Sequence, residues 1–286
     1  MQEFDNIYNK QITKKYAKHE IKRLSKRKER KRDIGAGRPF KLDVKDRCIM
    51  LLVYYRLYIT YTLSGFLFNL DQSNICRRDI QKIERQIRNC LPIPQKIFNI
   101  TKRLKTPEEV EQYFPGFLLS FIDSTEQQIP RPKDRRKRKA YYSGKKKRHT
   151  VKTQLMVNHR GFIIHKTANK KGRRHDYDIY KENHPLTPKQ VVNVVDLGYL
   201  GIEKDFPQQL SSTPNRKKRN LLQLSQQQKE YNRIHAKKRI VIEHTICRLK
   251  KYRILSDVFR NNLRKYNKVA DIVSGLINYR IMNYHN

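Results

Sequence analysis

The spacing of apolar residues along this chain changes at about residue 114, and this change limits the folds that the chain can adopt. From residue 40 to about 91 apolar residues recur every three or four positions, which predicts helices. After residue 114 they instead form short runs that are typical of strands, at 117–122, 150–158, 161–167 and 191–195, with a hairpin turn predicted at 158–161 between the second and third runs. Helical spacing returns at 225–255 and 269–277. We therefore predict an α+β protein, with a small all-helical part followed by a mixed sheet flanked by helices.

The first helical region has the pattern of a helix-turn-helix. Its apolar stripes comprise Leu42, Val44, Cys48, Leu51 and Leu52, then Leu63, Phe66, Leu67 and Leu70, then Ile75, Ile80, Ile83 and Ile87. A tight turn at 69–72 separates the second and third stripes, and Ser73 is the expected N-cap of the third helix. In such motifs the helix after the turn reads base edges in the major groove of DNA. The candidate DNA contacts on it are Arg77, Arg78, Gln81 and Lys82.

The charge of the chain points to a polyanionic partner. A formal net charge of +39 on 286 residues exceeds what solubility requires and favours nucleic acid over a membrane surface. Two basic stretches, 13–33 and 131–148, are interpreted as an arm and a loop that grip phosphates, although either is also compatible with a solvated segment. The sequence has no apolar run long enough to span a bilayer, and its four scattered cysteines predict reduced thiols in a cytosolic protein.

Three carboxylates stand out against this positive background. Asp123 and Asp196 each follow a strand-like run, and Glu243 lies within a helical pattern. Hard divalent cations prefer anionic oxygen ligands, so these three residues are candidate metal ligands. Arg239 and Lys250 fall on the same helical face as Glu243. The alternatives are that the aspartates only cap turns and that Glu243 only pairs with Arg239.

Three further residues lie beside these motifs. Glu126 and Asp176 are expected to support the metal ligands without binding metal themselves, and His244 is expected to serve packing.

The ordered set of motifs resembles the DDE-type bacterial insertion-sequence transposases, in the insertion-sequence-five group. The resemblance covers most of the chain. It rests on Phe121-Ile-Asp123-Ser-Thr-Glu126 through Ile129-Pro-Arg-Pro132, Lys145 to Lys152, Arg174-His-Asp-Tyr-Asp178, Val195-Asp196 to Gly201, and Arg239-Ile-Val-Ile-Glu243-His with Lys250.

The resemblance implies a ribonuclease-H-like catalytic domain. In it Asp123, Asp196 and Glu243 bind two Mg²⁺ ions, with Mn²⁺ able to substitute, while Arg239 and Lys250 lie near DNA. The expected domains are a basic arm and linker at 1–38, the helix-turn-helix at 39–98 and the catalytic domain at 99–286.

The implied activity is binding of the terminal inverted repeats of the chain's own element, followed by metal-dependent cleavage and strand transfer. The implied partners are double-stranded DNA, as element ends and target, and a second copy of the chain in a homodimer on DNA. The implied location is the bacterial cytoplasm, at the nucleoid. The alternative interpretations are a helix-turn-helix regulator without catalytic activity and an inactive relic of a transposase.

Overall fold

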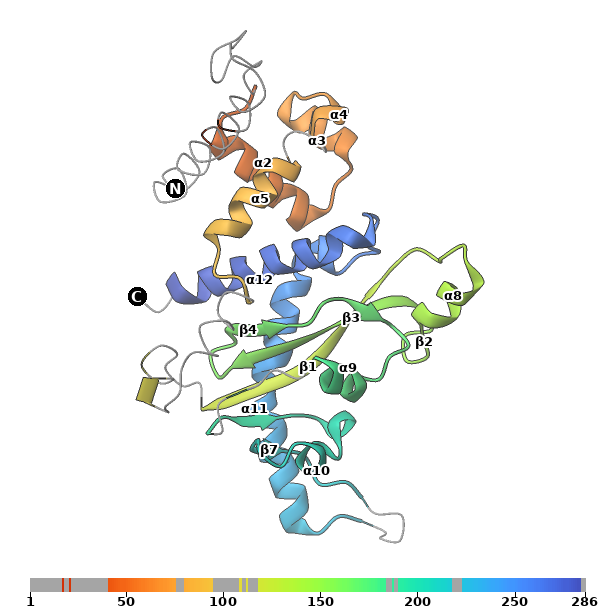
Figure 1. The fold of residues 1–286 in the computed structure, drawn as a ribbon, viewed down its shortest axis with the longest axis vertical. Helices are drawn as coiled ribbons and strands as arrows, with labels where there is room; N and C mark the ends of the chain where they lie inside the picture. Colours follow the sequence, from red (N-terminus) through yellow and green to blue (C-terminus); the bar gives the residue numbers. More distant parts are fainter. Residues whose placement is uncertain are drawn as a thin grey trace. The chain divides into compact units, whose positions relative to one another are not determined.

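The computed structural model of the chain describes residues 41–75, 80–94, 118–183, 190–217 and 223–283, together with a few isolated positions between these ranges. The chain divides into two compact units, Met1–Leu91 and Pro92–Asn286 (Figure 1). The two units are described separately.

The first unit is helical. Its described elements are α2 (Val44–Leu57), α3 (Tyr61–Phe68), α4 (Gln72–Asn74) and α5 (Gln81–Cys90). The predicted stripe at Ile75, Ile80, Ile83 and Ile87 is buried, as expected for the core face of a helix. Within this core the Tyr55 hydroxyl donates to Glu84 Oε1 at 2.9 Å, and burial raises the pKa of Tyr55 well above its usual value.

The turn between α3 and α4 is built by side chains on both sides of it. Asn69 ends α3 in the left-handed region, with φ of 48°, and Asp71 caps α4 by accepting from the Ser73 amide. Asp71, rather than the predicted Ser73, is therefore the cap. The Asp71 carboxylate accepts from both the amide and the hydroxyl of Ser73, which lowers the pKa of Asp71.

The prediction that α3 packs through an apolar stripe is wrong. Leu63 and Leu67 are exposed, and Phe66 is 82% exposed. The buried face of α3 instead carries Ser64 and Gly65, where a Cβ on Gly65 would stand only 2.6 Å from the Leu70 carbonyl oxygen. The backbone of α3 thus approaches the following turn at a distance that only glycine allows.

The second unit is built on a mixed sheet with the central strand order β2-β3-β1-β6-β7. The strands are β1 (Leu119–Gln128), β2 (Tyr142–Ser143), β3 (Arg148–Asn158), β4 (Ile163–Lys166), β5 (Lys170–Lys171), β6 (Val192–Val194) and β7 (Ser211–Ser212). Strand β3 is antiparallel to β1 and β4, whereas β6 runs parallel to β1 and β7. The predicted α+β class, with a ribonuclease-H-like mixed sheet, is confirmed.

The turn between β3 and β4 forms where the sequence predicts a hairpin. The Asn158 side chain accepts from the amides of Arg160 and Phe162, and Gly161 adopts a positive φ of 79°. Glycine takes this conformation without the steric cost that a side chain brings.

Strand β1 runs further than the sequence pattern predicts. The expected strand ends at Ile122, but the ladder with β3 continues from Ser120 to Gln128, so Asp123 lies within a strand. Polar residues after Ile122 remain extended because they find partners in the fold. For example, the Gln127 amide donates to the Ile254 carbonyl at 2.8 Å.

Helices cover both faces of this sheet (Figure 1). One face carries α9 (Asp176–Glu182), η2 (Leu197–Tyr199) and α10 (Ile202–Asp205), which share a core cluster with Ile122 and Met156 of the strands. The other face carries α11 (Gln226–Lys250), η3 (Arg253–Leu255), η4 (Leu263–Lys265) and α12 (Tyr266–Asn283). Helix α8 (Arg135–Tyr141) precedes β2. No helix in the described ranges is long and apolar enough to cross a membrane.

Candidate active site

The register of two parallel strands places Asp123 and Asp196 side by side. Phe121 of β1 is paired with Val194, the last residue of β6, and Asp123 and Asp196 each lie two residues further along the chain from this pair. Adjacent strands lie about 4.8 Å apart. Two carboxylates that are far apart in sequence therefore meet at one point of the sheet.

A buried polar pair fixes this register. The Ser120 hydroxyl donates to Asn193 Oδ1 at 2.6 Å across β1 and β6, and both residues are fully buried. The amide of Asn193 is directed at Gln209 and Thr187, with distances of 3.3 and 3.4 Å to their side-chain oxygens. A buried polar group without a partner is costly, so these contacts favour one alignment of β6 on β1.

Asp123 lies in a partly desolvated position beside a cation. Its side chain is 23% exposed, its Oδ1 accepts from the Ser124 amide at 2.7 Å, and its Oδ2 accepts from Arg239 Nη2 at 3.3 Å. Burial, with smaller contributions from the carboxylates of Asp196 and Asp176, raises the pKa of Asp123 to about 6, and the Ser124 amide and Arg239 offset only part of this rise. Burial thus disfavours the charged form of Asp123 more than its hydrogen bond and its ion pair favour that form.

We expect the stability of the metal-free protein to depend on pH through Asp123. Its pKa in the fold lies above its ordinary value of 3.8, so its stabilising contribution is complete below about pH 4 and is lost as pH rises through about 6. Acidification from about pH 7.5 to about pH 5 should raise the free energy of unfolding by about 1 kcal/mol relative to Asp123→Asn. Chemical denaturation in EDTA at both pH values measures this difference. The same pH dependence in both proteins would contradict the assignment.

Asp196 begins a short helical turn. Its Oδ1 accepts from the Gly198 amide at 2.9 Å, so Asp196 is the N-cap of η2. The capping role foreseen as an alternative is therefore real. It engages one carboxylate oxygen, and a carboxylate has a second oxygen with which to bind another group.

Helix α11 brings its charged face toward these strands. The helix starts with a capping box at Ser225 and Gln228 and packs against β1. Arg239 makes the ion pair with Asp123. Burial and the nearby cation of Lys146 lower the pKa of Lys250, and the carboxylates of Glu126 and Asp123 offset part of this decrease. Glu243 is exposed one turn after Arg239, and its neighbour His244 is also exposed.

The donor chemistry of the site suits a hard divalent cation. Asp123 and Asp196 offer anionic oxygens, and the Asp123 carboxylate is largely buried beside a single guanidinium. In the described part of the chain, however, no three His, Cys, Asp or Glu side chains lie close enough together to hold a metal ion. The structure brings the two aspartates and Arg239 together and leaves Glu243 at the surface of α11.

Lys152 is a central residue of this region that the sequence analysis did not identify as functional. Its side chain is 11% exposed, and its Nζ lies 3.1 Å from Asp176 Oδ1, 3.6 Å from Glu126 Oε1 and 2.8 Å from the Arg174 carbonyl oxygen. Glu126 and Asp176, the expected supporting residues, are therefore joined through one buried ammonium group. A lysine in the middle of a predicted strand was the available signal, but its partners depend on the register of β1 and β3.

Tyr199 is a second residue that the sequence did not single out. Its buried hydroxyl lies 2.8 Å from the Gln154 amide nitrogen, which donates to it, and 3.4 Å from the Ser124 hydroxyl. Burial raises the pKa of Tyr199 well above its usual value, and the carboxylates of Asp176, Asp123 and Asp196 contribute in the same direction. Tyr199 therefore stays neutral beneath the carboxylates.

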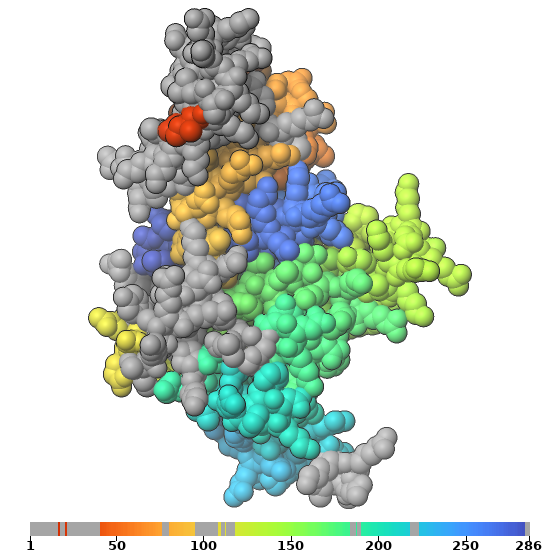
Figure 2. Space-filling model, viewed as in Figure 1, coloured from red at the N-terminus to blue at the C-terminus, as the bar shows by residue number. Residues whose placement is uncertain are grey.

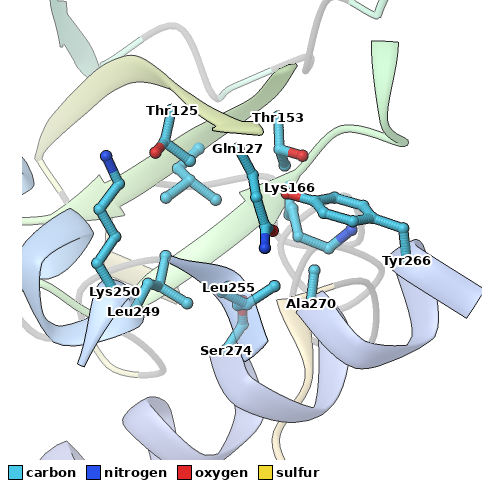
Figure 3. A pocket seen from close by; sticks show the side chains of 11 residues that line it. Thr125, Gln127, Thr153, Lys166, Leu249, Lys250, Leu255, Tyr266, Ala270 and Ser274 are labelled. Carbon is cyan, nitrogen blue, oxygen red and sulfur yellow. The ribbon is translucent and has the colours of Figure 1, made fainter. Parts of the chain in front are cut away.

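A small cavity lies behind the site, between the sheet and helices α11 and α12 (Figure 3). Its volume is about 20 Å³, which is room for about one water molecule. The Gln127 Oε1 and Ser274 Oγ atoms at its wall are buried and have no hydrogen-bond partner among the described residues. Lys250 lines one side of this cavity, and its ammonium points away from the cavity in Figure 3.

The candidate DNA contacts of the first unit are only partly covered by the structure. Gln81 and Lys82 lie in the first turn of α5, with Lys82 exposed. Arg77 and Arg78 fall outside the described residues, as does the basic stretch at 13–33 apart from two isolated positions.

Comparison with known proteins finds a matching protein family for each of the two units. A family described as "DDE superfamily endonuclease" matches residues 122–278, and one described as "Helix-turn-helix of DDE superfamily endonuclease" matches residues 40–92. A protein named "Probable transposase for insertion sequence element IS702", from Microchaete diplosiphon, is 34% identical over 248 residues, which cover 86% of this chain and 83% of that protein. No solved structure matches the chain.

Proposed function

Because the chain belongs to the DDE-type insertion-sequence transposases and carries their helix-turn-helix domain, we propose that it binds the terminal inverted repeats of its own element, cleaves DNA there and joins the freed end to target DNA. The observation that carries this proposal is that Asp123 of β1 lies near Asp196, which follows the adjacent parallel strand β6, and beside Arg239 of α11. Two carboxylates and a guanidinium at one point suit phosphodiester chemistry, in which negative charge must be held and balanced.

The metal chemistry of the family is assigned to three residues of this chain. Asp123, Asp196 and Glu243 would hold divalent cations, with Mg²⁺ as the proposed ion and Mn²⁺ as a substitute. When bound, such cations activate an attacking oxygen and neutralise charge on the phosphate. Glu243 is exposed, so its part in this set requires it to turn toward the two aspartates from its place one turn after Arg239.

The protein's own cations then have separate tasks. Arg239 holds the Asp123 carboxylate in a fixed orientation through its Nη2, and its Nε is buried without a hydrogen-bond partner in the described part of the chain. Lys250 extends from the same helix face, is exposed and lies near enough to Asp123 for that carboxylate to act on its pKa. We assign to Lys250 the binding of a phosphate oxygen beside the scissile bond, because a cation without a close carboxylate is drawn to phosphate.

DNA binding is assigned to both units. The helix-turn-helix reads base edges of the element ends through Arg77, Arg78, Gln81 and Lys82, and the excess of lysine and arginine holds phosphates in a manner that weakens with salt. Joining two element ends in one reaction requires two active sites on one DNA complex. We therefore include a homodimer on DNA in the proposal.

A helix-turn-helix regulator that binds the same DNA without cutting it is the second candidate. The observation in its favour is that no set of three metal-binding side chains is gathered in the described ranges. The two candidates differ in one measurable property, because only the transposase needs a divalent cation for its effect on DNA.

The test uses the purified full chain and the DNA that flanks its own gene. Nicking or joining at the element ends in Mg²⁺ or Mn²⁺, with none in EDTA, is the expected result. Gel-shift measurements on the same DNA, across several salt concentrations, establish that binding persists in EDTA. Binding of the ends without any metal-dependent change in the DNA would favour the regulator.

A further inference from the structure

A basic groove lies at the end of the sheet, away from the paired aspartates. It is open to solvent and has a volume of about 900 Å³. Its lining comes from the segment before β2, from the start of β3 and from the loop before α9, and consists of Arg131, Arg135, Arg138, Lys139, Tyr142, Gly144, His149 and Arg173. The segment that carries α8 and β2 projects from the second unit in Figure 2.

The groove has cations and no carboxylate in its wall. Arg131, Arg135, Arg138, Lys139 and Arg173 form no ion pair with a carboxylate among the described residues. The one nearby acid in the segment, Asp134, is used as the N-cap of α8, where it accepts from the Lys137 amide at 2.7 Å. Five like charges around one open groove repel one another unless an anion binds between them.

A close backbone approach shapes one wall of the groove. A Cβ on Gly172 would stand 2.1 Å from Thr150 Oγ1 and 2.8 Å from the Tyr141 carbonyl oxygen, so only glycine fits there. The Gly172 amide donates to the Thr150 carbonyl at 2.9 Å, and the Arg173 amide donates to the Ala140 carbonyl at 3.3 Å. These contacts hold Arg173 against the end of α8, so the groove is fixed by the fold.

One aromatic side chain stands among these cations. Tyr142 is 42% exposed, and its ring makes a T-shaped contact with His149, with centroids 5.7 Å apart. The two residues are also paired across β2 and β3, which orients the Tyr142 ring. An exposed, braced aromatic ring among cations is the arrangement that binds single-stranded nucleic acid, with phosphates on the cations and a base stacked on the ring.

The distance from the groove to the paired aspartates corresponds to a few nucleotides. The Ile129 amide donates to the His149 carbonyl at 2.9 Å, and Ile129 lies six residues beyond Asp123 along the extended chain that continues β1. At about 3.3 Å per residue the groove is roughly 20 Å from Asp123. A stacked strand advances about 3.4 Å per nucleotide, so this span is about six nucleotides.

We propose that this groove holds an unpaired DNA strand a few nucleotides from the reaction centre, with its phosphates on Arg135, Arg138 and Arg173 and one base stacked on Tyr142. In a duplex the bases are stacked inside, so only an unpaired nucleotide can present a base face to Tyr142. The role of this strand in the reaction rests on the proposed function. The binding itself needs neither metal nor cleavage.

The first test is a photochemical crosslink with the full-length protein. The probe is a short oligothymidine that carries one iodouracil base, offered single-stranded or paired to its complement. The adduct, mapped by mass spectrometry, is expected at Tyr142 with the single strand and to be about tenfold weaker with the duplex. Adducts that map to other aromatic residues, or that form equally with the duplex, would overturn the proposal.

Substitutions of Tyr142 separate stacking from hydrogen bonding. Tyr142→Ala should weaken binding of the unlabelled oligothymidine about tenfold and leave duplex affinity unchanged, because each stacked base contributes strongly to single-strand affinity. Tyr142→Phe keeps the ring and should restore the affinity. Tyr279→Ala removes another exposed tyrosine and serves as the control. Equal weakening of single-strand and duplex binding by Tyr142→Ala would contradict the assignment.

The charges are tested through the salt dependence of binding. Replacing Arg135, Arg138 and Arg173 by Gln together should reduce the slope of log affinity against log salt concentration by about 2 for the single strand, since each phosphate contact contributes about 0.7. An unchanged slope would overturn the phosphate contacts. A control with the same loss of charge on exposed cations outside the groove, Lys204, Lys229 and Arg264, should change the slope less.

These outcomes are independent of the cleavage assay. A protein that gives the Tyr142 crosslink but never cuts DNA would contradict the proposed function and leave the groove assignment intact. A protein that cuts DNA in Mg²⁺ but shows no effect of Tyr142→Ala on single-strand binding would contradict the groove alone. An RNA oligomer of the same length, bound more tightly than DNA, would also overturn the choice of DNA.

Discussion

Asp196→Asn is expected to reduce metal-dependent DNA cleavage by about a thousandfold or more while leaving the fold and DNA affinity intact. Divalent cations supply several kcal/mol of charge stabilisation in phosphodiester transfer, and an amide is a poor substitute for an anionic ligand. The cap on η2 survives, since an asparagine oxygen also accepts from the Gly198 amide. The measurement is the initial rate of end cleavage in Mg²⁺ at protein concentrations that saturate the DNA in a gel shift.

The matched control is Asp178→Asn. Asp178 is an exposed residue of α9, so this change removes the same charge without touching the paired aspartates. It should leave the cleavage rate within about twofold of the unmodified protein, as expected for a surface charge. A cleavage rate that fell equally in both variants, or that was unaffected by Asp196→Asn, would remove Asp196 from the catalytic set.

Lys152→Met is expected to cost about 3–5 kcal/mol of folding stability. The substitution keeps the volume of the side chain but leaves the carboxylates of Glu126 and Asp176 without their shared cation in a largely buried position. The midpoint of urea denaturation, followed by far-ultraviolet circular dichroism in EDTA, should fall with an unchanged slope. Cleavage should fall as well, because Asp176 acts electrostatically on Asp123.

Two further variants keep this prediction testable if Lys152→Met alone does not fold. Adding Glu126→Gln removes one of the uncompensated charges and should recover part of the lost stability. Lys170→Met breaks the partly exposed ion pair with Glu182 and should cost less than about 1 kcal/mol. Similar losses of folding stability from Lys152→Met and Lys170→Met would show that burial does not strengthen the interaction of Lys152 with Glu126 and Asp176.

Much of the fold followed from local patterns. The buried stripe from Ile75 to Ile87, the hairpin turn at Gly161 and the last two long helices all depend on periodicity or on turn residues that act within a few positions. The failures came where distant segments decide the outcome. The α3 stripe is exposed because Gly65 has to approach Leu70, and β1 continues past Asp123 because β3 offers it a long partner.

The candidate site likewise has features that local sequence predicts and features that depend on the fold. Residue type and order identified Asp123, Asp196 and Arg239 as members of one group, and the structure brings these three together. The raised pKa of Asp123 and the bridging position of Lys152 depend on burial and on cross-strand register, which no local pattern contains. Glu243 remains a proposed ligand that the sequence motif supports more strongly than the geometry does.

The buried Ser120–Asn193 hydrogen bond has a consequence for how copies of this gene can decay. If β6 shifted by one residue along β1, Val195 would take the place opposite Asp123 and the Asp196 carboxylate would turn to the other face of the sheet. The helix-turn-helix belongs to the other unit and would be unaffected. If the proposed function holds, Asn193→Leu is therefore expected to be a single step by which an inherited copy loses the ability to cut and still competes with active copies for DNA.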